Sequence, residues 1–367
     1  MKKKNWICLA LALMMSLGLL GCTPGASAPS TPPSGSSGAP QGGGQEDDLP
    51  KGSIVLKITS VCGAEGQHPF GNTCVAFEKR VEEESNGVID VQVYPNSQLG
   101  NERELYEGML SGDVEMFYGG SMVLGNFTNK VKFWGLPFFF SSGRQACLEF
   151  FDTYGEQLQK DIYDEIGLYC IWTDNGAFQP ASQFEIKTPA DMAGLKLRCH
   201  EIDTFIKGYE ALGAAPVPMA FGEIYTGLQQ GTINGTHTND VLLESNKFYE
   251  VCNYYASNIN ITYDMGVTGI SGAWFDQLPE KYQEIVWRNA QLFSQEFNAN
   301  LVEWEQMIDK RLQEECGVTF TVYTPAQRQA FIDVVQPVYE EFKSSGIEPK
   351  FDEYYAAAQE LNQKHEQ

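Results

Sequence analysis

The longest periodic segment of the chain, from Pro279 to Cys316, limits the choice of fold more than any other feature. Its apolar residues recur at a spacing close to 3.6, the period of an α-helix, and Pro279 suits the first turn of a helix. At 1.5 Å per residue this helix would be roughly 55 Å long. That length exceeds one small domain, so the segment predicts a helix over 279–316 that spans two domains.

Short strands alternate with amphipathic helices in the body of the chain, which begins near Ser53. This alternation predicts an α/β fold, and the body is long enough for two domains. The expected strands are Ile54–Ser60, Val88–Pro95, Val114–Gly120, Gly167–Thr173 and 194–200. The expected helices are Thr73–Ser85, Asn101–Leu110, Gln145–Ile166, Ile202–Leu212 and Phe221–Gln230.

The start of the chain predicts secretion. Three lysines precede an apolar run from Trp6 to Leu20, and this run is shorter than the roughly 20 residues of a spanning helix. We therefore expect a signal peptide over 1–21. The run ends in "LLGC", the pattern of a lipoprotein signal, which predicts lipidation of Cys22. The alternative is a plain signal peptide followed by a chance cysteine.

A stretch rich in Gly, Ser and Pro follows Cys22. Such a stretch cannot bury enough apolar surface to offset the entropy of ordering. Residues 22–52 are therefore expected to be a lipidated cysteine and a flexible tether, which would hold an extracytoplasmic body at a membrane.

Net charge argues against one class of partner. The chain carries −23, and removal of the three signal lysines would leave −26. Nucleic-acid binding needs a basic patch, so no nucleic acid is expected. Beyond Cys8 and Cys22, seven cysteines remain, with no C-x-x-C and no metal-finger spacing, so neither a disulfide framework nor a metal site is predicted.

Catalytic motifs are missing from the sequence. There is no H-E-x-x-H, G-x-S-x-G, P-loop or G-x-G-x-x-G, and only four histidines occur, His68, His200, His237 and His365. We therefore expect a protein that is not an enzyme and has no cofactor. A secreted two-domain α/β body of this kind suggests a receptor that closes around a small solute.

The stretch "GLKLRCH", residues 194–200, offers a binding group for such a solute. Leu195 and Leu197 alternate with Lys196 and Arg198, as in a half-buried strand. A planar guanidinium matches a carboxylate with two hydrogen bonds and keeps its charge. From the residues alone, Arg198 is equally well an exposed arginine at the end of a strand.

Several collinear stretches resemble the solute-binding proteins of TRAP (tripartite ATP-independent periplasmic) transporters, the DctP-like group. They are "SNGVIDVQVYPNSQLGNERELYEGMLSGDVEMFYG", "LPFFF", "TPADMAGLKLRCH" and "LGAAPVPMAFGEIYTGLQQGTINGT". The resemblance implies an α/β, two-domain, periplasmic-binding-protein-like (type II-like) fold with a hinge. It also implies, as membrane partner, a permease with a small and a large subunit.

The resemblance gives approximate domain bounds. Domain I is expected over 53–175 and 264–290, and domain II over 176–263 and 300–367, with the helix 279–316 spanning both.

The resemblance also implies a role for Arg198, a two-pronged salt bridge to the carboxylate of an organic acid. Two positions depart from the family pattern. The family motif D-G-Q-E-N-P aligns with "NGTHTN", so Thr238 replaces the ligand-binding asparagine, and Asn239 is the alternative donor. A second family arginine aligns with Phe178, which predicts a lost positive charge and an aromatic face.

Other cleft residues follow from the same alignment. Phe221 is expected to pack on the ligand, and Tyr225 matches a family tyrosine whose role is either binding or structural. Tyr118 and Gly120 end a strand that should face the cleft. His68 is expected to offer a polar contact, and Trp172 is either a cleft wall or a core residue.

One anchored charge beside Phe178 predicts an apolar or aromatic monocarboxylate as ligand. A dicarboxylate or a sugar acid is the alternative, with Lys207 as a further basic residue. The receptor is expected to deliver this acid to a TRAP permease. Two rival interpretations remain. One is a module that passes its ligand to a membrane sensor, and the other is an extracytoplasmic enzyme acting on an acid.

Overall fold

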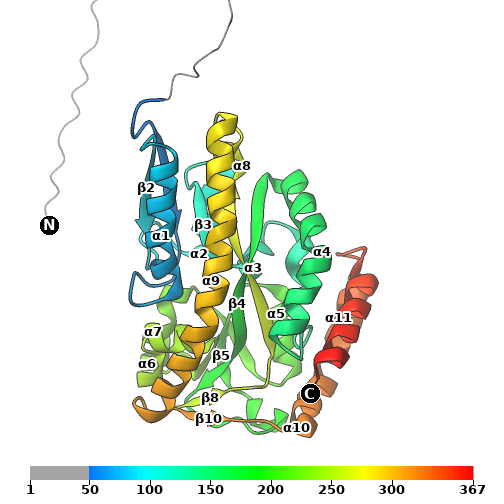
Figure 1. Cartoon of the computed structure of the whole chain (residues 1–367). Helices are drawn as coiled ribbons and strands as arrows, with labels where there is room; N and C mark the ends of the chain where they lie inside the picture. The colour runs from blue at the N-terminus through cyan, green and yellow to red at the C-terminus, as the bar shows by residue number, and fades with distance from the viewer. Residues whose placement is uncertain (1–48, 367) are drawn as a thin grey trace, which may run out of the picture. The chain divides into compact units, whose positions relative to one another are not determined.

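One long strand joins two groups of strands in the computed structural model, which describes residues 49–366. The strand β4 (Leu168–Ser182) pairs with β9 (Thr262–Ser271) as far as Phe178, and its last residues pair with β7 and β8. The sequence predicted this strand only as far as Thr173. The extension makes β4 a member of both groups (Figure 1).

The first group has the order β2-β1-β3-β9-β4. Its first three members are parallel, and β3, β9 and β4 are antiparallel neighbours. These strands are β1 (Ile54–Thr59), β2 (Ile89–Tyr94) and β3 (Met116–Gly120).

The second group has the order β4-β7-β5-β6, with β8 on β4 and β10 on β8. Within it β7, β5 and β6 are parallel. The segment "NGTHTN", which aligns with the family motif, contains β7 in its four middle residues. The members are β5 (Lys196–Cys199), β6 (Ala215–Pro218), β7 (Gly235–Thr238), β8 (Tyr254–Ala256) and β10 (Thr319–Thr321).

A β-bulge interrupts the pairing of β4 with β9. Asp174 lies opposite Met265 and Gly176 opposite Asp264, so Asn175 is an extra residue without a partner on β9. Gly176 has φ +85°, a left-handed conformation that costs a glycine little. The bulge points Asn175 to one face of the sheet, while Asp174 binds Arg144 on the other (Nε to Oδ2, 2.7 Å).

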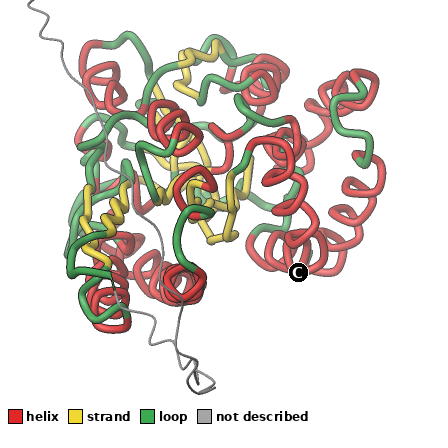
Figure 2. The backbone as a smooth tube through the Cα atoms, turned by 90° about the horizontal axis from the view of Figure 1, so that it is seen from above, coloured by secondary structure: helices red, strands yellow, loops and turns green. Residues whose placement is uncertain are grey.

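The long helix is confirmed as α9 (Glu280–Glu314), about 52 Å at 1.5 Å per residue. It runs past both groups of strands in Figure 1. Arg80 on α1 (Pro69–Glu84) forms two hydrogen bonds with the Glu296 carboxylate, which ties α1 to α9. A view from above shows strands in the interior and others near the edge of the molecule, with helices between and around them (Figure 2).

The remaining helices pack around the strands. Near the C-terminus, α11 packs on α4 and α10 packs on α5. The α-helices are α2 (Glu102–Ser111), α3 (Ser121–Leu124), α4 (Arg144–Ile166), α5 (Asp203–Ala211), α6 (Ile224–Gln230), α7 (Asp240–Ser245), α8 (Gly272–Phe275), α10 (Pro325–Ser345) and α11 (Phe351–His365). Short 3₁₀ helices are η1 (Asn129–Gly135), η2 (Pro189–Met192), η3 (Phe221–Glu223) and η4 (Phe248–Glu250).

The predicted α/β class is confirmed, whereas the predicted division into two domains stays a prediction. The predicted signal peptide, Cys22 and most of the tether lie outside residues 49–366. Within these described residues, none of the helices combines the length and the apolar character that a bilayer crossing requires.

Candidate functional site

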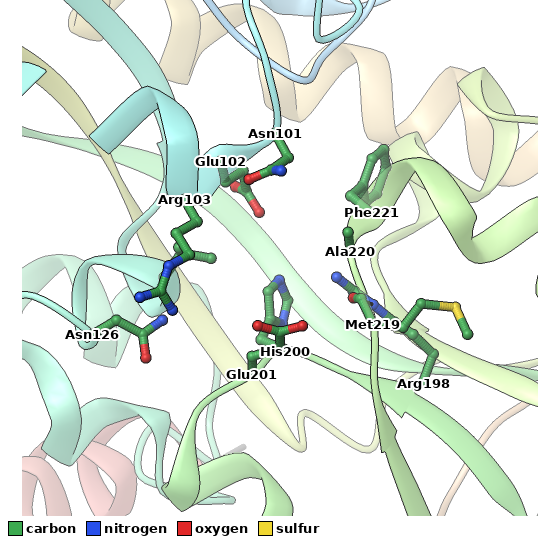
Figure 3. A pocket seen from close by; sticks show the side chains of 11 residues that line it. Asn101, Glu102, Arg103, Asn126, Arg198, His200, Glu201, Met219, Ala220 and Phe221 are labelled. Atoms are coloured by element: carbon green, nitrogen blue, oxygen red, sulfur yellow. Dashed lines mark hydrogen bonds between the residues drawn. The ribbon is translucent and has the colours of Figure 1, made fainter. Parts of the chain in front are cut away.

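A cavity lies where parallel strands of both groups reach their carboxyl ends, a common place for ligands in α/β proteins. Its walls come from the start of α2, from the residues after β5 and from the residues after β6 (Figure 3). It encloses about 520 Å³ of empty space, part of it open to solvent. We call it the outer cavity. It is lined by Asn101, Glu102, Arg103, Val123, Asn126, Arg198, His200, Glu201, Met219, Ala220 and Phe221.

A second, narrower inner cavity adjoins the first and holds about 400 Å³ of empty space, part of it open to solvent. Glu102, Arg198, His200 and Phe221 line both, so these four residues form the boundary between them. The other lining residues of the inner cavity are Val61, Cys62, Tyr118, Gly119, Gly120, Asn175, Phe178, Leu242 and Asp264.

Arg198 is the cation at this boundary, and its side chain is buried (2 % exposed). Its Nε donates to the carbonyl oxygen of Met219 at 3.0 Å, and its Cζ lies 6.0 Å from the Phe221 ring centre. Within residues 49–366 its two Nη groups have no hydrogen-bond partner and no carboxylate lies within 4.0 Å. Burial lowers the pKa of Arg198, Glu102 opposes that shift, and a guanidinium keeps its charge in proteins. Two charged donors are therefore available to a ligand.

Two buried carboxyl groups line the inner cavity together with this cation. Burial raises the pKa of Glu102 to about 7, although Arg198 and the Gly120 N–H act in the opposite direction. Burial likewise raises the pKa of Asp264 to about 6. Asp264 accepts hydrogen bonds from Ser121 Oγ at 2.8 Å and Asn175 Nδ2 at 2.7 Å, so its oxygens are already engaged. Within the described part of the chain, the Glu102 carboxyl accepts only a long 3.3 Å bond from the Gly120 N–H.

His200 follows Arg198 by two residues and its ring enters the site (Figure 3). The side chain is buried, and within the described residues Nδ1 has no hydrogen-bond partner. Burial lowers the pKa of His200 well below its usual value, and Arg198 and His237 lower it further. The imidazole is therefore neutral at physiological pH.

His237 lies behind the site and is fully bonded. Its Nδ1 lies 2.5 Å from Tyr209 Oη and its Nε2 lies 2.9 Å from Thr262 Oγ1. Its ring is 5.4 Å from that of Phe178. We infer that His237 supports the wall formed by Phe178.

The structure brings together five of the residues named from the sequence. Arg198 and Phe221 line both cavities, and Phe178, Tyr118 and Gly120 line the inner one. Tyr118 Oη also donates to Asn175 Oδ1 at 3.1 Å, which fixes the bulged residue.

Thr238 and Asn239 lie at the end of β7 and line neither cavity. Thr238 Oγ1 donates to the backbone at Asn239. Asn239 is the N-cap of α7, where its Oδ1 accepts from the Leu242 N–H at 2.8 Å and its Nδ2 donates to the Asn175 carbonyl at 2.9 Å. Neither side chain points to a ligand here, and Asn239 instead supports the bulge.

His68, Tyr225 and Trp172 also line neither cavity. His68 is the N-cap of α1 and accepts from the Phe70 N–H, while Tyr225 Oη donates to Glu250. Trp172 donates to the Gly155 carbonyl at 2.8 Å and packs on Trp134, so the structure places it in the core. Lys207 pairs with Glu341 away from the site.

Sequence reasoning missed most of the polar wall. Asn101, Glu102 and Arg103 come from "LGNER", where Asn101 is the N-cap of α2 in a capping box with Glu104. The signal was available, because polar residues at the start of a helix that follows a strand and a turn lie near the carboxyl ends of strands. Asn175 and Asp264 had no such signal, since the bulge that places them is a property of strand pairing.

Comparison with known proteins identifies the family. The model of the DctP family, described as bacterial extracellular solute-binding protein, family 7, matches residues 63–345. The chain belongs to this family. The DctP-like TRAP resemblance seen in the sequence is confirmed, and so is the expectation that the protein is not an enzyme, because this is a family of extracytoplasmic binding proteins.

One relative supports this membership, and two solved structures support the fold, along most of the chain. A Vibrio cholerae relative, the C4-dicarboxylate-binding periplasmic protein DctP, is 32% identical over 80% of this chain and 87% of its own. A TRAP solute-binding protein from Anaerococcus prevotii, solved with bound glucuronate, has a TM-score of 0.77 at 24% identity and covers 85% of this chain and 99% of its own. One from Shewanella oneidensis, solved with succinate, has a TM-score of 0.78 at 24% identity and covers 84% and 99%. The predicted periplasmic-binding-protein fold is confirmed.

Proposed function

We propose that this DctP-family protein is the extracytoplasmic receptor of a TRAP transporter for a hydroxylated organic acid of the sugar-acid type. The observation that carries the proposal is the buried Arg198, which lines both cavities and whose two Nη groups have no hydrogen-bond partner within residues 49–366. These donors would bind the ligand carboxylate, as the sequence analysis expected.

The apolar or aromatic monocarboxylate is the less favoured ligand. The named relatives bind a dicarboxylate or carry succinate or glucuronate, and all of these acids are polar. The outer cavity offers Asn101, Asn126 and His200 as groups that suit hydroxyls. Phe178 remains as one aromatic wall of the inner cavity.

A dicarboxylate fits less well than a sugar acid. Among the residues that line the two cavities, Arg103 is the second cation, and it is exposed and paired with Glu107. Glu102 and Asp264 would repel a second carboxylate inside the site. A ligand with one carboxylate on Arg198 and hydroxyls on the neutral polar groups would give more of the lining side chains a hydrogen-bond partner.

The test is a binding series with purified residues 49–367 and D-gluconate, succinate and benzoate, measured by calorimetry. We expect D-gluconate to bind most tightly. Arg198→Met should weaken it by more than 100-fold, because two charge-assisted hydrogen bonds are lost at about 1.5–3 kcal/mol each. Lys207→Met removes one positive charge outside the site and should leave the affinity unchanged. Tight benzoate binding, or an Arg198→Met variant that binds normally, would contradict the proposal.

The membrane attachment is a separate part of the proposal. Lipidation of Cys22 would keep the receptor beside the permease and raise its local concentration there. We expect the Cys22→Ser protein to leave the membrane fraction while its acid affinity stays unchanged. Membrane retention of this variant would contradict the lipid anchor and leave the binding proposal intact.

A further inference from the structure

His200 is a buried polar group that the proposed carboxylate contact does not use. Its side chain is 7 % exposed, and its buried Nδ1 has no hydrogen-bond partner within residues 49–366. It borders both cavities together with Arg198 (Figure 3). A buried polar group left unpaired is costly, so such a group at a binding site points to the ligand as its partner.

We propose that His200 binds a hydroxyl group next to the ligand carboxylate, so that the ligand is a 2-hydroxy acid. The proposal rests on the proposed function, because Arg198 must hold the carboxylate. Arg198 and His200 are two residues apart at the end of β5, about 7 Å along an extended chain. Both side chains line the same two cavities, so a carboxylate on Arg198 would place its neighbouring carbon in a space that His200 also borders.

The hydrogen-bonding capacity of His200 selects a hydroxyl. A neutral imidazole carries one donor and one acceptor, and a hydroxyl group also donates and accepts. Burial and the neighbouring Arg198 favour the neutral form, since both lower the pKa of His200. A hydroxyl can therefore pair with the ring nitrogen that it meets, whether that nitrogen donates or accepts, whereas a methylene group at the same position would leave this nitrogen unpaired.

Two other ligand groups match this environment less well. A second carboxylate only accepts, and it would approach the Glu102 carboxyl. An ammonium group only donates, and it would stand beside the Arg198 guanidinium. The hydroxyl carries no charge and meets neither repulsion.

The test compares three acids that differ only at carbon 2: D-gluconate, 2-deoxy-D-gluconate and 2-amino-2-deoxy-D-gluconate. We expect the wild-type protein to bind D-gluconate 10- to 100-fold more tightly than the deoxy acid, and more tightly than the amino acid. Equal affinity for the hydroxy and deoxy acids, or tighter binding of the amino acid, would overturn the assignment.

Variants of His200 separate recognition from packing. His200→Ala should bring the ratio of the hydroxy and deoxy affinities close to one and change the deoxy affinity less than threefold. His200→Asn places an amide near the position of Nδ1 and should restore most of the ratio. Melting curves of both variants check that the fold is kept.

The outcomes distinguish this inference from the proposed function. If Arg198→Met abolishes binding of all three acids but His200→Ala keeps the wild-type ratio, the carboxylate receptor stands and the hydroxyl assignment is overturned. Equal weakening of the hydroxy and deoxy acids by His200→Ala overturns it as well. If none of the three acids binds to the wild-type protein, both proposals fall.

Discussion

Glu102 and Arg198 place opposite charges on two walls of one cavity. The two groups attract each other, since Arg198 lowers the pKa of Glu102. Burial outweighs this attraction and raises the pKa of Glu102 to about 7. No ion pair closer than 4.0 Å joins them within the described residues. Glu102 is therefore a group whose charge changes in the range where the receptor works.

This titration predicts that acid binding weakens as pH rises. A ligand carboxylate binds best when Glu102 is protonated, and the ionised fraction of a group with pKa about 7 grows steeply between pH 7 and 8. We expect the dissociation constant of D-gluconate to rise about fivefold over this interval, measured by calorimetry. Arg198 stays charged and His200 stays neutral here, and Asp264 is already mostly ionised.

The matched control is Glu102→Gln, which keeps the shape and removes the titration. Its affinity should match that of the wild-type protein at low pH and should stay flat from pH 7 to 8. An equally steep profile in this variant would assign the effect to another group.

At the scale of the element, the bulge in β4 decides which side chains reach the site. Gly176 has φ +85°, and a Cβ added there would lie 3.1 Å from Glu305 Oε1. Because a non-glycine residue in this region costs roughly 1–2 kcal/mol, Gly176→Ala should lower the free energy of unfolding in urea by about that amount. It should also weaken D-gluconate binding, because Asn175 and Asp264 shift with the bulge.

Gly194→Ala is the control for this variant. Gly194 also has a positive φ (+72°), but an added Cβ would meet nothing within 4 Å, and the residue precedes β5 at the end away from the site. It should lose similar stability and keep the wild-type affinity. If Gly176→Ala also kept the wild-type affinity for D-gluconate, the bulge would not be what positions Asn175 and Asp264 at the inner cavity.

The elements differ in how far their sequence specifies them. The helix α9 was predicted nearly to its ends, since one face of a long helix repeats a local pattern many times. The strand β9 was not predicted, because all ten of its residues are buried and no alternation marks it. Arg198 and Phe221 were found through the family resemblance. Glu102 and His200 were not, because their roles depend on segments about 100 residues apart meeting at one cavity.

At the scale of the molecule, β4 predicts cooperative unfolding. The two groups of strands share this strand, so loss of β4 removes a pairing partner from each group at once: β9 in the first, and β7 and β8 in the second. We expect residues 49–367 to melt in one calorimetric transition, both free and with D-gluconate. Ligand at about 100 times its dissociation constant should add about 2.7 kcal/mol to the free energy of unfolding. Two resolved transitions would contradict this and favour two domains that unfold independently.

The extra residue in β4 also has a consequence for protein engineering. Removing Asn175 would let β4 and β9 pair without interruption, a change that stability-directed redesign tends to favour. The same deletion would take away the amide that holds Asp264 and Tyr118 at the inner cavity. A more regular strand at this position would give a poorer receptor, so efforts to stabilise the protein are best directed at surfaces away from residues 174–176.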